Sequence, residues 1–152
     1  MKRIVIIGNS AAGFSCCDYL IKNSRDFEIT VISPESFPAY NRNMLVDFLA
    51  GKVKEEDLFL CPPDYYEKNK INFLKNARGS RIDTKKQAVV LKDNSKLAFD
   101  FLVIASGQKI EISDIPGHTK DGVFSLYNLE DAKKIKDKLM LADTVCIIGN
   151  PD

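Results

Sequence analysis

The sequence has almost no net charge. Its 22 lysine and arginine residues are balanced by 21 aspartate and glutamate residues, which leaves a formal net charge of +1 over 152 residues. Proteins that bind a nucleic-acid backbone use a strong positive field to neutralise its phosphates. We therefore expect no nucleic-acid partner.

Long hydrophobic runs are also missing. The longest purely apolar runs, such as Ile4 to Ile7, fall far short of the roughly 20 residues that span a membrane. They are also too short for the apolar region of a signal peptide. Because 45% of the residues are hydrophobic and 28% are charged, a folded core is expected. These features predict a cytoplasmic protein without a membrane segment.

Metal ligands and redox cysteine pairs are scarce. His118 is the only histidine, and the four cysteines include no Cys-x-x-Cys pair, so we expect no metal site. Cys16 and Cys17 are interpreted as small helix residues, because adjacent side chains on a helix diverge. His118 follows a Pro-Gly turn and has no acidic or hydroxyl residue placed to form a catalytic triad with it, so we expect no catalytic role for it. We predict no catalytic residue elsewhere in the chain.

The first 33 residues have the pattern of a βαβ nucleotide-binding unit. An apolar run over 2–7 predicts a strand, and the glycine-containing turn Gly8–Gly13 follows it directly. Apolar residues then recur at helical spacing up to residue 23, and a second β-rich run covers 27–33. This order of strand, glycine turn, helix and strand is typical of dinucleotide binding.

The turn itself has the chemistry of a pyrophosphate site. Gly8 would permit a tight turn and Gly13 close packing of helix on strand, while Ser10 stands where a middle glycine is common. The free amides of a helix N-terminus would then hold the phosphates. The alternative is a glycine turn kept only for packing.

A ribose partner is expected about 20 residues after the motif. That position is Ser33, and Glu35 is the nearest carboxylate, although Glu35 could equally be an exposed loop charge. No basic residue follows the strand directly, which disfavours a 2′-phosphate. Arg42 lies after a proline-containing loop, where its guanidinium either reaches a phosphate or a flavin edge or remains a solvated surface charge.

The rest of the chain predicts further regular elements. Helices are expected over 43–49 and 62–70, a β-meander over 81–99, a buried strand over 101–105, a helix capped by Asn128 over 128–139, and a buried strand over 144–148. The sequence Ile-Ile-Gly-Asn occurs at 6–9 and again at 147–150. This repeat is either chance or the start of a second dinucleotide fold.

Taken in order, these motifs resemble the FAD-dependent pyridine-nucleotide oxidoreductases, and within them the branch of NADH:rubredoxin reductase, NADH oxidase and the nitrite reductase large subunit. The matching segments are 6–13, 40–42, 49–52, 100–107, 115–117 and 122–139. The resemblance implies an α/β, Rossmann-like FAD-binding domain with a parallel sheet, flanking helices and a small antiparallel β-meander. It also implies FAD contacts at Gly8, Asn9, Ser10, Ala11, Ala12, Gly13, Ser33, Glu35, Arg42, Asn43, Gly79, Ala105, Ser106 and Gly107.

Two departures from the family refine this expectation. No cysteine stands at 42–44, where relatives of the family carry redox cysteines, so electrons are expected to pass directly from the flavin to an acceptor such as rubredoxin, nitrite or oxygen. The later segments that complete the FAD site and bind NAD(P)H are absent. We therefore expect residues 1–117 to be the N-terminal part of an FAD-binding domain, and 118–152 to be a linker, a helix and the first strand of a truncated NAD(P)-binding domain.

On this interpretation the chain alone would be inactive, and NAD(P)H would bind only the full-length form. An uncovered apolar face would favour a homodimer, and a rubredoxin-like protein is the expected redox partner. Two alternatives remain open: a non-catalytic module that binds NAD or an adenine nucleotide, and a fragment that folds without binding a cofactor.

Overall fold

The computed structural model describes residues 1–24, 26–108 and 115–149. Contacts divide the chain into two compact units. The first unit comprises Met1–Asn41 and Phe59–Gln108, and the second comprises Arg42–Leu58 and Lys109–Asp152. The domain boundary expected after residue 117 stays a prediction.

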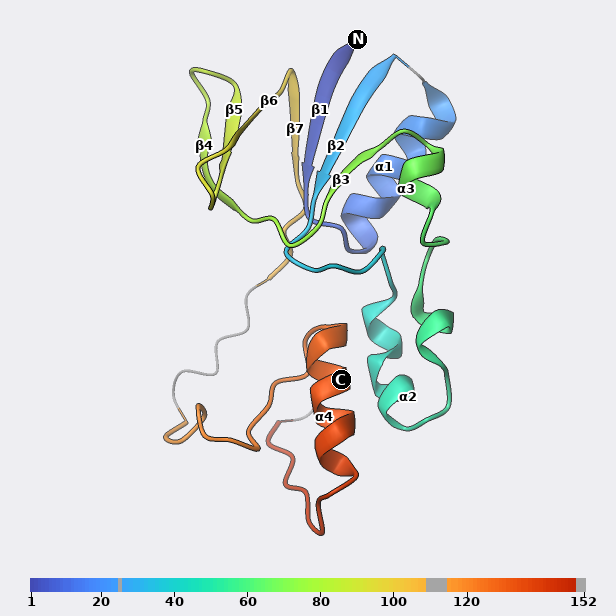
Figure 1. Ribbon diagram of the computed structural model, residues 1–152, viewed down its shortest axis with the longest axis vertical. Helices are drawn as coiled ribbons and strands as arrows, with labels where there is room; N and C mark the ends of the chain where they lie inside the picture. Colours follow the sequence, from blue (N-terminus) through green and yellow to red (C-terminus); the bar gives the residue numbers. More distant parts are fainter. Residues whose placement is uncertain (25, 109–114, 150–152) are drawn as a thin grey trace. The chain divides into compact units, whose positions relative to one another are not determined.

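A four-stranded parallel sheet forms the centre of the first unit (Figure 1). Its strands are β1 (Lys2–Ile7), β2 (Phe27–Ile32), β3 (Asn72–Leu74) and β7 (Phe101–Ile104), in the spatial order β3-β2-β1-β7. In this register Ile7 pairs with Ile32 of β2 and with Ile104 of β7. The carboxyl ends of the three strands therefore meet at one edge of the sheet, where α/β proteins bind ligands.

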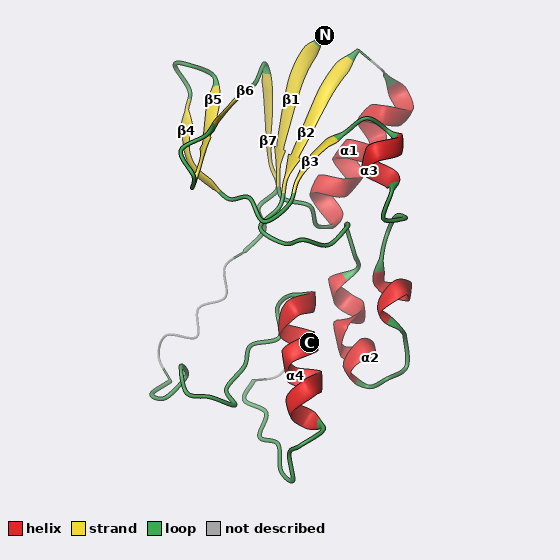
Figure 2. Cartoon of the chain, viewed as in Figure 1, coloured by secondary structure: helices red, strands yellow, loops and turns green. Residues whose placement is uncertain are grey.

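Both faces of the sheet are covered, by different kinds of structure (Figure 2). Helices α1 (Ala11–Asn23) and α3 (Tyr65–Lys68) pack on the face that carries Ile4 and Ile6. The other face carries Val5 and packs against a three-stranded antiparallel sheet of β4 (Gly79–Asp83), β5 (Ala88–Leu91) and β6 (Lys96–Ala98). Alternate side chains of a strand point to opposite faces, so β1 contributes to both halves of the core.

The α/β fold class expected from the sequence is confirmed, including the β-meander, but three elements of the first unit differ. The strand over 101–105 was expected to be buried and this is wrong: β7 lies at an edge of the sheet, and Ile104 is 64% exposed. The helix expected over 62–70 is limited to α3, since Lys70 has a positive φ of 57° that a helix cannot continue. The short strand β3 was not predicted.

The second unit is helical. It contains the 3₁₀ turns η1 (Arg42–Met44) and η2 (Glu55–Leu58) and the helices α2 (Leu45–Leu49) and α4 (Leu129–Leu139). Helix α4 packs on α2, with the ammonium group of Lys136 4.3 Å from the ring centre of Phe48. The predicted cap of α4 is confirmed, because Asn128 and Asp131 form a reciprocal capping box.

The strand expected over 144–148 is wrong. These residues have no regular structure, and Ile147 is 81% exposed. A strand needs a neighbour to pair its backbone, and no strand is described among 42–58 and 115–149. Part of the repeated motif, at Asn150, lies outside the described residues.

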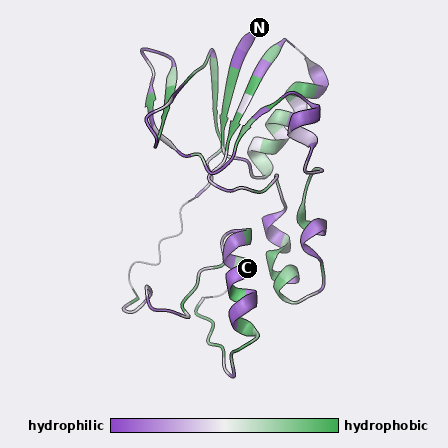
Figure 3. Cartoon of the chain, viewed as in Figure 1, coloured by the Kyte–Doolittle hydropathy of each residue, from purple (hydrophilic) through white to green (hydrophobic). Residues whose placement is uncertain are grey.

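Hydropathy follows this packing (Figure 3). Apolar residues dominate β1 and β2, whereas α4 is mostly hydrophilic with short hydrophobic bands. No helix among the described residues is both long enough and apolar enough to cross a membrane.

Candidate functional site

Two turns meet at the carboxyl edge of the parallel sheet. One turn follows β1 and begins at Gly8, and the other follows β7 and begins at Ala105, whose N–H group donates a 2.8 Å hydrogen bond to the carbonyl of Ile7. Gly8 has a φ of 109°, and a Cβ atom placed there would overlap the carbonyl oxygen of Ala105. Only glycine fits this position, because both its conformation and its surroundings exclude a side chain.

Gly13 brings helix α1 close to the end of β1. It is buried in the first turn of the helix, and an added Cβ would overlap the carbonyl oxygen of Gly8. The missing side chain lets the helix start directly above the strand. The close helix–strand packing expected at Gly13 is thus present.

The N-terminus of α1 offers unused hydrogen-bond donors. The cap residue Ser10 is extended, with φ −93° and ψ −169°, and its side chain makes no capping hydrogen bond. The first amides of a helix lack partners within the helix, and here Ala11 and Ala12 are exposed. The first turn contains no acidic residue, so the exposed positive end of the helix dipole suits an anion.

Asn9 adds a side-chain donor to this turn. Its Oδ1 atom accepts a 2.7 Å hydrogen bond from the hydroxyl of Tyr66. Its Nδ2 atom is buried and has no acceptor among the residues that the structure describes. Leaving a buried donor unsatisfied costs about 1–3 kcal/mol, so an acceptor atom from a ligand would stabilise this arrangement.

The two expected ribose contacts have different environments. Ser33 is 3% exposed, and its hydroxyl oxygen accepts a 3.1 Å hydrogen bond from the N–H group of Glu35. The carboxylate of Glu35 is partly buried and accepts a 2.6 Å hydrogen bond from the hydroxyl of Tyr40. Of the two side chains, Glu35 is the better acceptor for ribose hydroxyls, since hydrogen bonds to a charged carboxylate are stronger than those to a neutral hydroxyl.

Gly79, Ser106 and Gly107 belong to the first unit and are exposed. Gly79 begins β4, and a Cβ atom built there would lie 3.8 Å from Cδ1 of Ile7. Ser106 and Gly107 continue the turn after β7. The first unit thus places all three in segments that border the ends of β1 and β7.

Arg42 and Asn43 belong to the second unit. The guanidinium of Arg42 lies 4.5 Å from the ring centre of Tyr127 and donates a 3.2 Å hydrogen bond to its carbonyl oxygen, and Asn43 is exposed. Arg42 is therefore held by Tyr127 and is not simply a solvated surface charge. A contact of either residue with the cofactor stays a prediction.

Sequence reasoning missed two tyrosines. Tyr66 reaches Asn9 across 57 positions, and Tyr40 is only 4% exposed beside Glu35. The sequence does predict a helix around Tyr66, but the direction of its side chain depends on how that short helix packs.

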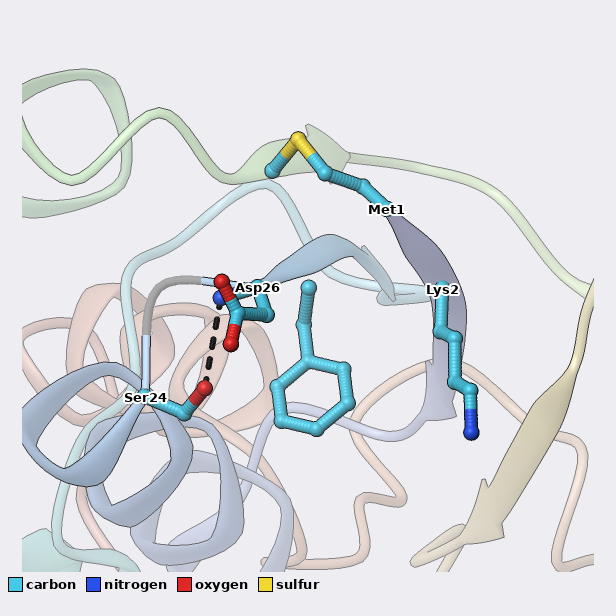
Figure 4. A pocket seen from close by; sticks show the side chains of 5 residues that line it. Met1, Lys2, Ser24 and Asp26 are labelled. Atoms are coloured by element: carbon cyan, nitrogen blue, oxygen red, sulfur yellow. Dashed lines mark hydrogen bonds between the residues drawn. The ribbon is translucent and has the colours of Figure 1, made fainter.

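A shallow hollow lies at the opposite end of the sheet (Figure 4). It is lined by Met1, Lys2, Ser24, Asp26 and Phe27, at the amino ends of β1 and β2. Two of the lining residues are joined by a 3.2 Å hydrogen bond, which the N–H group of Asp26 donates to the Ser24 hydroxyl. This position is away from the glycine turns, so it is not the candidate site.

The comparison with protein families agrees with this geometry. The sequence profile named pyridine nucleotide-disulphide oxidoreductase matches residues 2–150. The chain belongs to this family. The resemblance expected from the ordered motifs is thereby confirmed.

The chain is also similar to curated proteins. The chain is 34% identical over 147 residues to the NADH-rubredoxin oxidoreductase of Clostridium acetobutylicum, covering 97% of this chain and 38% of that protein. It is 32% identical over 149 residues to the assimilatory nitrate reductase electron transfer subunit of Bacillus subtilis, covering 97% of this chain and 19% of that protein. It thus spans well under half the length of these relatives.

A solved structure confirms the fold. The crystal structure of NADH:rubredoxin oxidoreductase from Clostridium acetobutylicum superposes with a TM-score of 0.82 at 33% sequence identity. The match covers 92% of this chain and 36% of that chain.

Proposed function

We propose that this chain is the FAD-binding portion of a flavin-dependent NAD(P)H oxidoreductase. The observation that carries the proposal is the contact between the two turns at Gly8 and Ala105, with the N-terminus of α1 held close by Gly13. Two strands end there, and the start of α1 leaves backbone donors exposed beside their turns. Such an arrangement suits a dinucleotide pyrophosphate.

Different residues of the first unit would contact different parts of the cofactor. The turn Gly8–Gly13 would hold the pyrophosphate through its amides and through the amide group of Asn9. Glu35 would accept hydrogen bonds from the ribose of the adenosine, near Ser33 and Gly79. The turn of Ala105, Ser106 and Gly107 would lie by the flavin. The family resemblance also implies contacts of Arg42 and Asn43 with the flavin and pyrophosphate, and these belong to the same proposal.

Bound FAD would supply the chemistry, accepting a hydride equivalent and releasing electrons to an acceptor. The part of the protein is to hold the cofactor.

We further propose that electron transfer in the whole protein uses no redox-active cysteine. Burial raises the pKa of Cys17 to about 12 and also raises the pKa of Cys61. The thiolate is the reactive form, so both side chains are poor nucleophiles. No cysteine stands in the segment 42–44.

The acceptor and the hydride donor are part of the same proposal. The relatives named above carry NADH, rubredoxin and nitrate reductase in their names, and an acceptor such as rubredoxin, nitrite or oxygen fits this chain. NAD(P)H would bind to further segments of the full-length form, so the chain alone would consume NADH only negligibly. Exposed apolar residues would favour a homodimer of the isolated chain.

Ligand selectivity tests the proposal. The chain is purified and its visible spectrum is recorded, and its melting temperature is then measured with FAD, with NAD and without ligand. We expect flavin absorption or an increase in melting temperature that is specific to FAD, because a ligand that binds only the folded state stabilises it. An increase with NAD but not with FAD would instead support a nucleotide module of another kind, and no response to either would support a fragment without a cofactor.

A further inference from the structure

The hydroxyl group of Tyr66 is the centre of a buried hydrogen-bond network behind the glycine turn. Tyr66 is 4% exposed, and its hydroxyl lies 3.3 Å from the N atom of Ala39 and 2.7 Å from Oδ1 of Asn9. The network therefore connects the segments of Ala39 and Tyr66 to the turn after β1.

The directions of these hydrogen bonds follow from the donors. The N–H group of Ala39 can only donate, so the oxygen of Tyr66 is the acceptor in that contact. The single hydroxyl proton of Tyr66 is then available for Asn9. Burial raises the pKa of Tyr66, which keeps this proton in place at neutral pH.

The orientation of the Asn9 amide is fixed as a result. Its oxygen must face Tyr66, because only the oxygen accepts a proton, and its NH₂ group must point away. The ring that carries the hydroxyl is itself held, since it stacks on Phe73 at 4.1 Å between ring centres and an angle of 21°. The buried Nδ2 atom then has no acceptor among the described residues.

We propose that Tyr66 is a positioning residue that aims the amide group of Asn9 at a phosphate oxygen of the bound cofactor. This inference rests on the proposed function, because the acceptor is taken to be the pyrophosphate of FAD. Tyr66 does not touch the cofactor. Its hydroxyl selects one of the two amide orientations, so that the turn meets the anion with a donor and not with a carbonyl oxygen.

A neighbouring tyrosine provides a matched control. Tyr65 lies on the same helix, and its hydroxyl donates a 2.8 Å hydrogen bond to Asp18, which is outside the turn. Tyr65→Phe and Tyr66→Phe each remove one tyrosine hydroxyl; the first removes the hydrogen bond to Asp18, and the second removes those with Ala39 and Asn9. Only Tyr66→Phe releases Asn9.

The test measures the dissociation constant for FAD together with the melting temperature of the ligand-free chain. We expect Tyr66→Phe to weaken FAD binding about tenfold, as the loss of one oriented hydrogen bond to a charged group does. Tyr65→Phe should leave the affinity within about twofold of the wild type. Equal affinities of Tyr66→Phe and Tyr65→Phe would overturn the inference.

Asn9→Asp keeps the test decisive if Tyr66→Phe folds poorly, and Asn9→Ala adds a double-mutant cycle if Tyr66→Phe folds well. Asn9→Asp retains an acceptor for Tyr66 but replaces the donor with a carboxylate, so it should fold as the wild type does and bind FAD at least about tenfold more weakly. In the background of Asn9→Ala, Tyr66→Phe should cause no further loss of affinity, since both changes remove the same contact. Additive losses, or wild-type affinity in Asn9→Asp, would contradict the inference.

These outcomes separate the inference from the proposed function. A folded wild-type chain that does not bind FAD overturns both. A wild-type chain that binds FAD, together with a Tyr66→Phe variant of the same affinity, overturns the inference alone.

Discussion

Gly8 lies so close to the main chain of Ala105 that a single added carbon would overlap the carbonyl oxygen of Ala105. We therefore predict that Gly8→Ala separates the two turns at the ends of β1 and β7. The variant should lose stability and bind FAD at least about tenfold more weakly. Calorimetric titration with FAD and thermal melting measure the two effects.

Gly122→Ala is the control for this change. Gly122 also has a positive φ, 83°, but nothing lies within 4 Å of a Cβ atom placed there. It should show only the cost of a left-handed alanine, about 1 kcal/mol, and should leave FAD affinity unchanged. Equal losses of FAD affinity in the two variants would argue against a contact-specific role for Gly8.

Glu35 and Tyr40 allow the ribose contact to be tested. Glu35→Gln retains an oxygen that accepts from Tyr40 but removes the charge, which weakens hydrogen bonds from ribose hydroxyls. We predict about a tenfold loss of FAD affinity with little change in melting temperature. The exposed Glu67, changed to Gln in the same way, should have no effect on binding.

Tyr40→Phe should give the converse result. It removes the 2.6 Å hydrogen bond to Glu35 from a side chain that is 4% exposed. Stability should fall by roughly 1–2 kcal/mol, because the loop between β2 and η1 loses an anchor, and denaturant unfolding measures this loss. If Glu35→Gln binds FAD with wild-type affinity, Glu35 serves only to hold this loop.

The cysteines should differ in their reactivity toward a thiol reagent at neutral pH. Cys146 is exposed, whereas Cys17 and Cys61 are buried and burial raises their pKa values, that of Cys17 to about 12. We predict rapid modification of Cys146 and protection of Cys17 and Cys61 until the chain unfolds. Mass spectrometry of the labelled peptides identifies the sites, and rapid labelling of Cys17 in the folded chain would contradict the proposed absence of a redox cysteine.

Asp18 should make stability depend on pH. Hydrogen bonds from Lys22 and Tyr65 hold the pKa of this carboxyl below its ordinary value of 3.8. A group whose pKa is lowered by folding stabilises the native state above its unfolded pKa, and this contribution disappears as the pH falls through the folded value. We therefore expect Asp18→Asn to lower the free energy of unfolding at pH 7 and to reduce its decline in acid, as measured by urea titration at several pH values. A parallel decline in both proteins would contradict this assignment.

Local patterns explain which elements could be predicted from the sequence. The strand β1, the turn Gly8–Gly13 and helix α1 follow one another within 23 residues, and their side-chain periodicities depend only on neighbouring positions. The cap of α4 by Asn128 is local in the same sense. Such elements were predicted correctly because tertiary contacts reinforce the local preference.

Elements that depend on distant partners could not be predicted. The apolar sequences of β7 and of residues 144–148 both indicate buried strands, yet burial requires neighbouring segments that the sequence pattern does not specify. The partners of Asn9 and Arg42 lie 57 and 85 positions away, at Tyr66 and Tyr127. Their side-chain contacts arise only from the packing of the fold.

The central claim is that the turn Gly8–Gly13 holds FAD, and a direct titration tests it. FAD fluorescence is followed as wild-type chain or Gly13→Val is added, and circular dichroism checks that each protein is folded. We predict saturable binding at one FAD per wild-type chain and no retained cofactor in Gly13→Val, whose side chain would overlap the carbonyl of Gly8. Folded wild-type chain that leaves FAD fluorescence unchanged, or equal binding by both folded proteins, would contradict the account.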